Sequence, residues 1–212
     1  ALRIQSAGTS FTSAFSTTVW NFGNSLTGLT LGKSGNTAAV TVGSNTTVNG
    51  PISIFGGAVT LSNSLTTTNA STGDVSITTT GLAGAGNISL AAGRGLTVTQ
   101  SGNSSYSGAI GGAGATFTKA GAGVLTVSGA NSFTGATTVS AGTLRSGAAG
   151  VLHDSTAVSV DSGAVWDLNH FAETVGSIAG SGSITLGSAT LTAGSTNADT
   201  AFSGVLSGTG GL

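Results

Sequence analysis

Cysteine and methionine are absent from this chain of 212 residues, proline occurs once and histidine twice. Without cysteine the chain cannot form disulfide bonds, iron–sulfur clusters or zinc–thiolate sites. Two histidines are too few for a histidine-rich metal site. The sequence therefore predicts neither a cofactor nor a bound metal ion.

Charged residues are also scarce. They make up 5% of the chain, with five Lys and Arg against six Asp and Glu, and the formal net charge is -1. Binding to a phosphate backbone requires a concentrated basic surface, so nucleic acid is not expected as a partner. Disordered chains combine low hydrophobicity with high net charge, whereas 38% of these residues are hydrophobic. The chain is therefore expected to fold.

Long apolar segments are missing as well. No run approaches the roughly 20 residues of a membrane-spanning helix, and the N-terminus lacks the charged and apolar regions of a signal peptide. The chain begins without methionine and ends within a repetitive pattern at Gly210-Gly211-Leu212. We interpret it as an internal piece of a longer protein.

Small residues and short aliphatic triplets dominate what is present. The chain contains 37 glycines, 31 serines and 35 threonines, almost half of its residues. Aliphatic and polar residues alternate in triplets such as Val40-Thr41-Val42, Val75-Ser76-Ile77 and Val158-Ser159-Val160. A period of two with β-branched residues indicates short strands with one buried face, and strong helix formers are almost missing. An all-β fold is expected.

The spacing of the triplets distinguishes between two all-β architectures. Three Thr-x-Thr triplets begin at the evenly spaced positions 78, 97 and 116, which predicts one inward column formed by Thr79, Val98 and Phe117. A β-sandwich would use tight Asn-Gly or Asp-Gly hairpins, and only Asn49-Gly50 supplies one. We therefore predict a parallel β-helix, or β-solenoid, with coils of about 19–22 residues.

A longer repeat is also visible. Ser105-Tyr106-Ser107-Gly108-Ala109-Ile110 returns further along the chain as Ala201-Phe202-Ser203-Gly204-Val205-Leu206, and Ser132-Phe133-Thr134-Gly135 repeats the aromatic, hydroxyl and glycine trio between them. We interpret this as one copy of a long module and the start of the next. The recurring aromatic residues are expected to fill the core as stacked rings.

One stretch in the second half of the chain carries a distinctive motif. Residues 121–144 follow the pattern G-x-G-x-L-T, then G-x-N-[ST]-[YF]-[ST]-G, then T-x-V-x-x-G-x-L. The positions that define it are Gly121, Gly123, Leu125, Gly129, Asn131, Phe133, Gly135, Val139, Gly142 and Leu144. The stretch resembles the autotransporter-associated β-strand repeat, also called the passenger-associated transport repeat. Ala136 stands where that family often has a second glycine.

The resemblance extends more loosely along the chain. Residues 160–169 and 174–182 look like the usual continuation of such passengers, and residues 1–111 resemble the shafts of filamentous-haemagglutinin-type exoproteins. We divide the chain into a β-solenoid shaft (1–111), the repeat (112–147), and further coils with the start of the next module (148–212).

The resemblance implies a right-handed β-solenoid in a large bacterial type V secreted or surface protein, commonly an adhesin. Together with the regular spacing, it leads us to predict a structural stalk or fibre segment at the cell surface or outside the cell. The near absence of charge, cysteine and histidine argues against an enzyme. The segment's partner would be an outer-membrane translocator barrel, supplied by the protein's own C-terminus or by a partner protein. A repeat without cysteine can pass unfolded through a pore and then fold coil by coil. Head-to-tail self-association into fibres is also open.

The charged and histidine residues suggest two alternatives to a passive stalk. They gather between positions 153 and 173: His153, Asp154, Asp161, Asp167, His170 and Glu173. A polysaccharide-degrading β-helix enzyme would pair two of the acids, and Asp154 and Glu173 are spaced to stack. A solvated loop is the preferred interpretation.

Binding of a glycan or a host surface protein is the other alternative, with Trp166, Asp167 and His170 as the candidate ligand-binding residues. Trp20 and Trp166 are each expected to be structural more often than sugar-binding. The Thr-x-Thr triplets also suggest an ice-binding solenoid as an alternative. The series is short, because Gly135 stands where the next triplet would begin. The four N-x-[ST] sequons, at 45, 69, 87 and 103, are no more than composition predicts.

Overall fold

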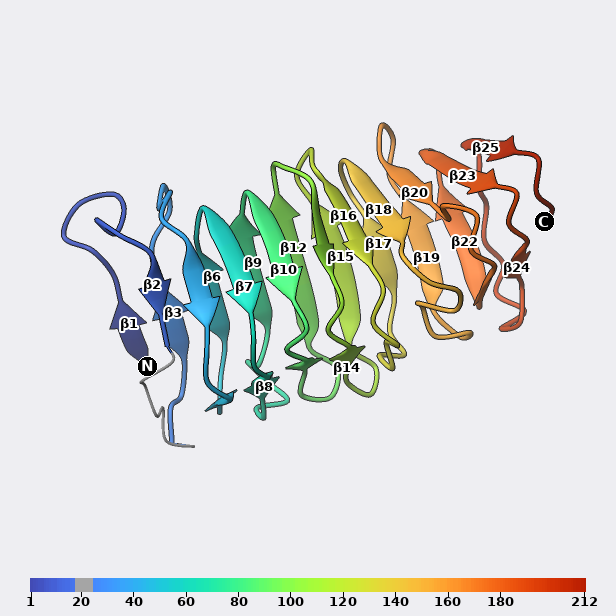
Figure 1. The fold of residues 1–212 in the computed structure, drawn as a ribbon. Helices are drawn as coiled ribbons and strands as arrows, with labels where there is room; N and C mark the ends of the chain where they lie inside the picture. The colour runs from blue at the N-terminus through green and yellow to red at the C-terminus, as the bar shows by residue number, and fades with distance from the viewer. Residues whose placement is uncertain (18–24) are drawn as a thin grey trace.

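The protein is an all-β solenoid. The computed structural model describes residues 1–17 and 25–212, which form 25 strands and no helix. Successive coils lie side by side from the N-terminal end to the C-terminal end (Figure 1). The described residues accordingly include no helix with the length and hydropathy that a membrane crossing requires. The predictions of an all-β fold and of a parallel solenoid are confirmed.

The described strands lie on three sides of the solenoid, and every strand pair is parallel. The first side is a nine-stranded sheet of β1 (Leu2–Ile4), β3 (Leu29–Leu31), β6 (Ile52–Phe55), β9 (Val75–Thr79), β12 (Gly95–Gln100), β15 (Thr116–Ala120), β17 (Thr137–Val139), β19 (Ala157–Val160) and β22 (Ser177–Gly180). At a strand spacing of about 4.8 Å, this sheet is about 40 Å long.

The second side is a ten-stranded sheet. Its strands are β2 (Phe15–Ser16), β4 (Val40–Val42), β7 (Ala58–Leu61), β10 (Gly81–Gly84), β13 (Ser104–Tyr106), β16 (Val124–Val127), β18 (Thr143–Ser146), β20 (Val165–Asp167), β23 (Ser183–Gly187) and β25 (Val205–Gly208). All four residues of β25 are exposed.

The third side is split into two short sheets. One contains β5 (Thr46–Val48), β8 (Leu65–Thr67), β11 (Ile88–Ser89) and β14 (Ile110–Gly111), and the other contains β21 (Glu173–Val175) and β24 (Leu191–Ala193). Between β14 and β21, where every residue is described, this side has no strand.

The register differs from the predicted column. Leu96 pairs with Val75 and with Phe117, and Thr79 pairs with Gln100, so these coils are longer by two positions than the spacing of the triplets. The predicted column of Thr79, Val98 and Phe117 is therefore wrong, although all three side chains are buried. Side chains of a strand alternate with a period of two, so a shift by two positions leaves each of them on the same face.

Coil length also varies along the solenoid more than expected. Leu2 pairs with Leu29 across a long first coil, whereas Trp166 pairs with Ile184 across a much shorter one. Most paired strands keep one register along their length, and β23 and β25 shift register between Thr185 and Gly187.

The outer face of the first sheet carries a longer hydroxyl ladder than the Thr-x-Thr triplets indicate. Its seven paired residues are Thr30, Ser53, Ser76, Thr97, Thr118, Thr138 and Ser159. The ladder thus continues past Gly135, where the sequence series ended, because paired residues are not spaced as the triplets are.

The recurring aromatic residues do not stack on one another. Tyr106 belongs to the second sheet, and Phe202 bridges to Gly180 of the first. Phe133 precedes β17 and packs edge-on against Phe117, with ring centroids 6.0 Å apart. Tyr106 and Phe133 are buried in the core as predicted, but the prediction that the recurring rings stack on one another is wrong. The longer sequence repeat does not return the chain to an equivalent place, because its period does not span a whole number of these coils.

One cation lies inside the core. Lys119 occupies an inward position of β15, in register with Val98, and its side chain is fully buried. Its amine donates hydrogen bonds to three backbone carbonyls, those of Ala120, Gly121 and Ala141, at 2.8–3.1 Å. Burial lowers the pKa of Lys119 to about 8.

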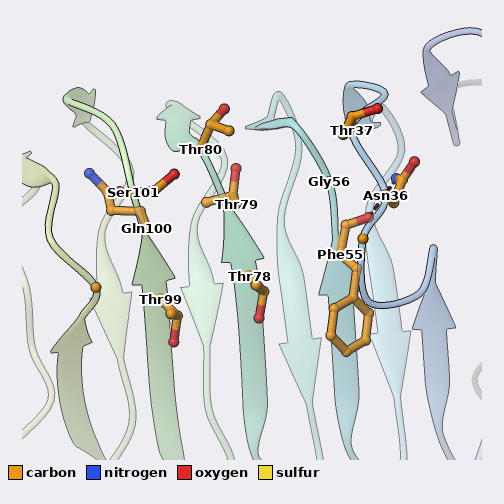
Figure 2. Close-up of a pocket in the computed structure, with 12 residues that line it drawn as sticks. Asn36, Thr37, Phe55, Gly56, Thr78, Thr79, Thr80, Thr99, Gln100 and Ser101 are labelled. Atoms are coloured by element: carbon orange, nitrogen blue, oxygen red, sulfur yellow. Dashed lines mark hydrogen bonds between the residues drawn. The ribbon is translucent and has the colours of Figure 1, made fainter. Parts of the chain in front are cut away.

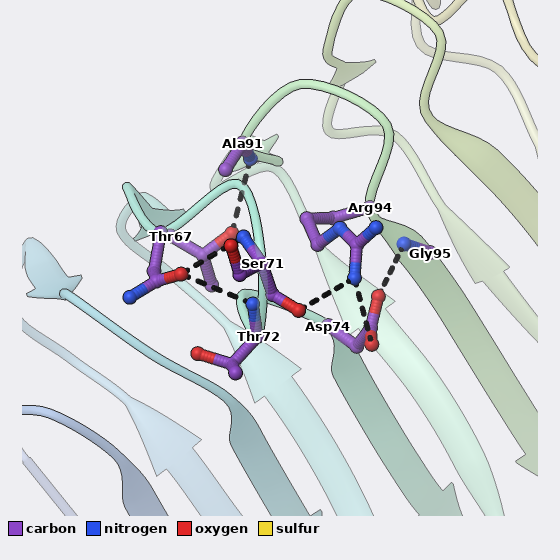
Figure 3. Close-up of polar contacts among 8 residues, drawn as sticks. Thr67, Ser71, Thr72, Asp74, Ala91, Arg94 and Gly95 are labelled. Atoms are coloured by element: carbon purple, nitrogen blue, oxygen red, sulfur yellow. Dashed lines mark hydrogen bonds and ion pairs between the residues drawn. The ribbon is translucent and has the colours of Figure 1, made fainter.

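Polar side chains also organise a corner between the third side and the first sheet (Figure 3). Asn69 accepts hydrogen bonds from the backbone N–H of Ser71 within its own turn. Arg94, from the next coil, donates a hydrogen bond to the Ser71 carbonyl at 2.9 Å, and its Nη1 lies 3.8 Å from Oδ2 of Asp74. Asp74 in turn accepts a hydrogen bond from the backbone N–H of Gly95. These contacts join the corners of two successive coils.

Candidate functional site

The glycines of the 121–144 motif lie where backbones of adjacent coils meet. Gly121 and Gly142 have φ angles of 76° and 65°, a conformation that favours glycine. A Cβ atom would overlap a carbonyl oxygen of the preceding coil at all five motif glycines, Gly121, Gly123, Gly129, Gly135 and Gly142. These positions are therefore required for the close stacking of coils.

The apolar residues of the motif fill the core. Leu125, Phe133, Val139 and Leu144 are each at most 1% exposed. Leu125 and Leu144 are paired across β16 and β18. No ligand at the surface can contact these four side chains, so their part in the motif is packing.

Asn131 bridges the gap in the third side. Its Oδ1 accepts a hydrogen bond from the N–H of Ile110 at 2.8 Å, and its Nδ2 donates to the carbonyl of Val151 at 2.7 Å. Ile110 lies in the coil before Asn131 and Val151 in the coil after it. The side-chain amide thus takes the place of a backbone peptide in a ladder that lacks a strand.

Asn131→Ala should lower the free energy of unfolding by about 2–3 kcal/mol, because it leaves the Ile110 N–H and the Val151 carbonyl without partners. Urea denaturation of the purified chain measures this change. Asn103→Ala is the matched control, since Asn103 is exposed and accepts one bond, from Val124. Equal losses in the two variants would contradict the bridging role.

Glu173 closes the same gap from the other end. Its two carboxylate oxygens accept hydrogen bonds from the N–H groups of Val151 at 3.1 Å and Leu152 at 3.3 Å, and the residue is 2% exposed. Burial is the main cause that raises its pKa to about 7; hydrogen bonds from backbone N–H groups oppose this increase, and the charge of Asp154 adds to it. The structure thus brings Asp154 and Glu173 near each other, but Glu173 is enclosed and cannot reach a substrate.

Asp167 is held in an ion pair. One of its oxygens lies 2.7 Å from Nε of Arg145, and the other accepts from the N–H of Asn169 at 2.9 Å. The Arg145 side chain comes from the preceding coil, where Arg145 pairs with Asp167 in register. The carboxylate therefore orients a turn and pairs with a cation of the neighbouring coil.

Trp166 does not face outward. Its side chain is 0% exposed and lies in register between Leu144 and Ile184. The preferred expectation of a structural role for Trp166 agrees with this burial. The alternative in which Trp166 binds sugar at the surface is wrong, since inward and outward positions alternate and this one points into the core. Trp20 lies outside the described residues.

His170 is exposed in the turn after Asp167. Asn169 and His170 both have positive φ angles, 49° and 68°, which reverses the chain sharply. The His170 Nδ1 lies 3.0 Å from Oγ of Ser188 and 3.1 Å from its backbone nitrogen. Asp167 and His170 thus share a turn, while Trp166 lies inside. Within the described ranges, His, Asp and Glu side chains form no group of three or more that could hold a metal ion.

Comparison with known families identifies the motif. Residues 117–145 match the family model of the passenger-associated-transport-repeat. No curated protein and no solved structure matches the chain. The segment is thus a passenger-associated transport repeat within a β-solenoid, which indicates an autotransporter passenger. Such a passenger implies a translocator domain in the same protein, and exposure at the cell surface or secretion.

Proposed function

We propose that this chain is a stiff stalk or fibre segment of a bacterial surface or secreted adhesin. The transport repeat and the β-solenoid that contains it support this proposal. The observation that carries the proposal is continuity. Parallel pairing runs from β1 to β22 in the first sheet and from β2 to β25 in the second. A segment of this kind holds the more distant part of the adhesin away from the cell surface.

Stiffness follows from how neighbouring coils are held. Backbone hydrogen bonds join them along the solenoid on two complete sides, and side chains such as Asn131 and Glu173 join them on the third. Inward columns such as Ile54, Ile77 and Val98 pack along the axis. Bending the solenoid would stretch the ladder on its outer side and break several hydrogen bonds together.

A catalytic role has less support from the geometry. Hydrolysis or elimination on a polysaccharide requires two accessible carboxyl groups that converge on one bond. Glu173 is enclosed, and Asp167 is paired with Arg145. We therefore propose that this segment is not an enzyme and that its polar turns are structural.

Contacts between consecutive coils also support folding after translocation. Each coil pairs with the one before it, so a chain that emerges from a translocator barrel can add one coil at a time. We propose that this barrel is the translocator domain of the same protein, C-terminal to the segment. The proposal requires only that the pore admits an unfolded chain.

The stalk function is tested by changing the length of the segment within its parent protein on cells. Deleting residues 1–212 should bring an epitope beyond the segment about 40 Å closer to the outer membrane, and a tandem duplication should move it outward by the same distance. Electron cryotomography measures the distance, and surface labelling of the epitope is the control for display. Loss of target binding with normal display in the deletion variant would contradict a purely structural role.

A further inference from the structure

An open groove of about 280 Å³ runs along the corner where the first sheet leads into the second (Figure 2). Its lining comes from five successive coils, at residues 35–37, 55–56, 78–80, 99–101 and 121. The groove therefore follows the solenoid axis, and its positions repeat at the spacing of the coils.

Two sets of side chains form the walls of the groove. The first lies on the outer face of the first sheet, where Phe55 pairs with Thr78 and Thr78 with Thr99, and the second is Thr80 and Ser101 at the turn that follows. Figure 2 shows these three side chains on neighbouring strands, with Thr80 and Ser101 at the turn above them. The aromatic ring of Phe55 is partly exposed at one end of the first set.

The floor of the groove is fixed in place. Each floor residue comes one position after a paired residue on the outer face of the first sheet. The floor residues are Gly56, Thr79, Gln100 and Gly121, so a glycine without a side chain stands at each end of the floor. The Thr79 hydroxyl donates to the carbonyl of Gly57 at 2.8 Å, and Gln100 Nε2 donates to that of Val124 at 2.8 Å. The floor residues are thus occupied by their own hydrogen bonds and hold the corner open.

The walls, by contrast, offer unused hydrogen-bonding groups. Among the described residues, nothing hydrogen-bonds to the hydroxyls of Thr78, Thr99 and Ser101, although the hydroxyl of Thr80 donates to the carbonyl of Gly57. Each of these hydroxyls can both donate and accept. The groove therefore presents one aromatic ring, several threonine methyl groups and three free hydroxyls.

These groups match a particular class of ligand. None of the twelve lining residues, all of them described, carries a charge, so neither an anion nor a cation finds a counter-charge there. A pyranose has a C–H face that packs on an aromatic ring and a rim of hydroxyls that hydrogen-bond to hydroxyls. Regular spacing along the axis favours a linear chain of such rings over a single sugar.

We propose that this groove binds a neutral, linear glycan chain. Phe55 lies under one sugar ring, and Thr78, Thr99 and Ser101 hydrogen-bond to hydroxyls of the rings that follow along the axis. The site goes beyond a passive stalk, and it lies away from the turn of Asp167 and His170. Because the groove is open and shallow, we expect binding in about the millimolar range.

Titration calorimetry of the 212-residue protein tests the proposal, with cellohexaose and chitohexaose as neutral probes and hexagalacturonate as an acidic one. At least one neutral hexasaccharide should bind more tightly than hexagalacturonate. Phe55→Ala should weaken that binding about tenfold or more, because the ring contact is lost. Thr99→Val, which keeps the shape and removes the hydroxyl, should weaken it about threefold.

Thr97→Val is the matched control, since Thr97 lies two residues earlier on β12, on the same outer face and outside the groove. It should leave binding unchanged. If circular dichroism shows that Phe55→Ala does not fold, the proposal is tested by comparing the hexasaccharide affinities of Thr99→Val and Thr97→Val. The proposal is overturned if neither neutral hexasaccharide binds, if hexagalacturonate binds more tightly, or if the two threonine variants weaken binding equally. None of these outcomes changes the distance measurement that tests the stalk.

Discussion

Trp166→Ala should lower the free energy of unfolding by about 3–5 kcal/mol. Trp166 stands first by volume among the fully buried side chains, and its replacement leaves a cavity between Leu144 and Ile184 that the two flanking coils cannot fill. Denaturation in guanidinium chloride, followed by circular dichroism, measures the loss. Phe171→Ala is the control, because Phe171 is an exposed aromatic residue in the following turn and its replacement should change stability by about 0.5 kcal/mol or less.

The polar atom of the same side chain refines this prediction. Within the described part of the chain, the buried Nε1 of Trp166 has no hydrogen-bond partner. Trp166→Phe should therefore cost less than Trp166→Ala, because it removes no hydrogen bond and keeps most of the apolar volume. An unchanged stability for Trp166→Ala, with binding of a glycan lost, would restore the surface-ligand interpretation.

Raising the pH from 5 to 8 should lower the free energy of unfolding by up to about 3 kcal/mol through Glu173 alone. Burial raises the pKa of Glu173 from 4.5 to about 7. Between these two values the folded protein keeps a proton that the unfolded chain releases. The stabilisation is therefore complete below about pH 4.5 and is lost as the pH rises through 7. Urea denaturation at a series of pH values measures it.

Glu173→Gln isolates this contribution, because its side chain does not titrate. The difference in stability between the wild-type protein and Glu173→Gln should change with pH from 5 to 8, because the two proteins differ at this side chain alone. Lys119 titrates at about 8 and above, so it lies at the edge of this window. A difference that stays constant with pH would show that Glu173 is ionised in the folded protein over the whole range.

The repeat motif shows how much of the fold is local. The alternation in Val40-Thr41-Val42 or Val158-Ser159-Val160 is enough to predict a strand and its buried face, because the period of two is a property of the extended backbone itself. The glycines at 121 and 142 are also predictable from the motif, since few other residues adopt their positive φ angles.

The register was beyond such local reasoning. Two coil lengths that differ by two positions leave the same side chains inside, so the pattern around Val98 fits either, and only pairing with Ile77 and Lys119 distinguishes them. The alternative in which Trp166 binds a ligand was wrong for a related reason. Trp166 stands beside Asp167 in a polar stretch, but neighbouring strand residues point to opposite faces, and which of the two is inside depends on the coils above and below.

By itself, the sequence determined an all-β chain and the transport repeat at residues 121–144, which the family model matches at 117–145, because these depend on residues close together in the chain. Parallel stacking was predictable from the regular spacing of the triplets. The tertiary structure alone decided which side chains share a column and which corner is open. The burial of Lys119, the bridging by Asn131 and Glu173, and the groove beside Phe55 all depend on contacts between residues of successive coils. The physical reason is that coils vary in length at their corners, so only the packed stack determines which residues meet.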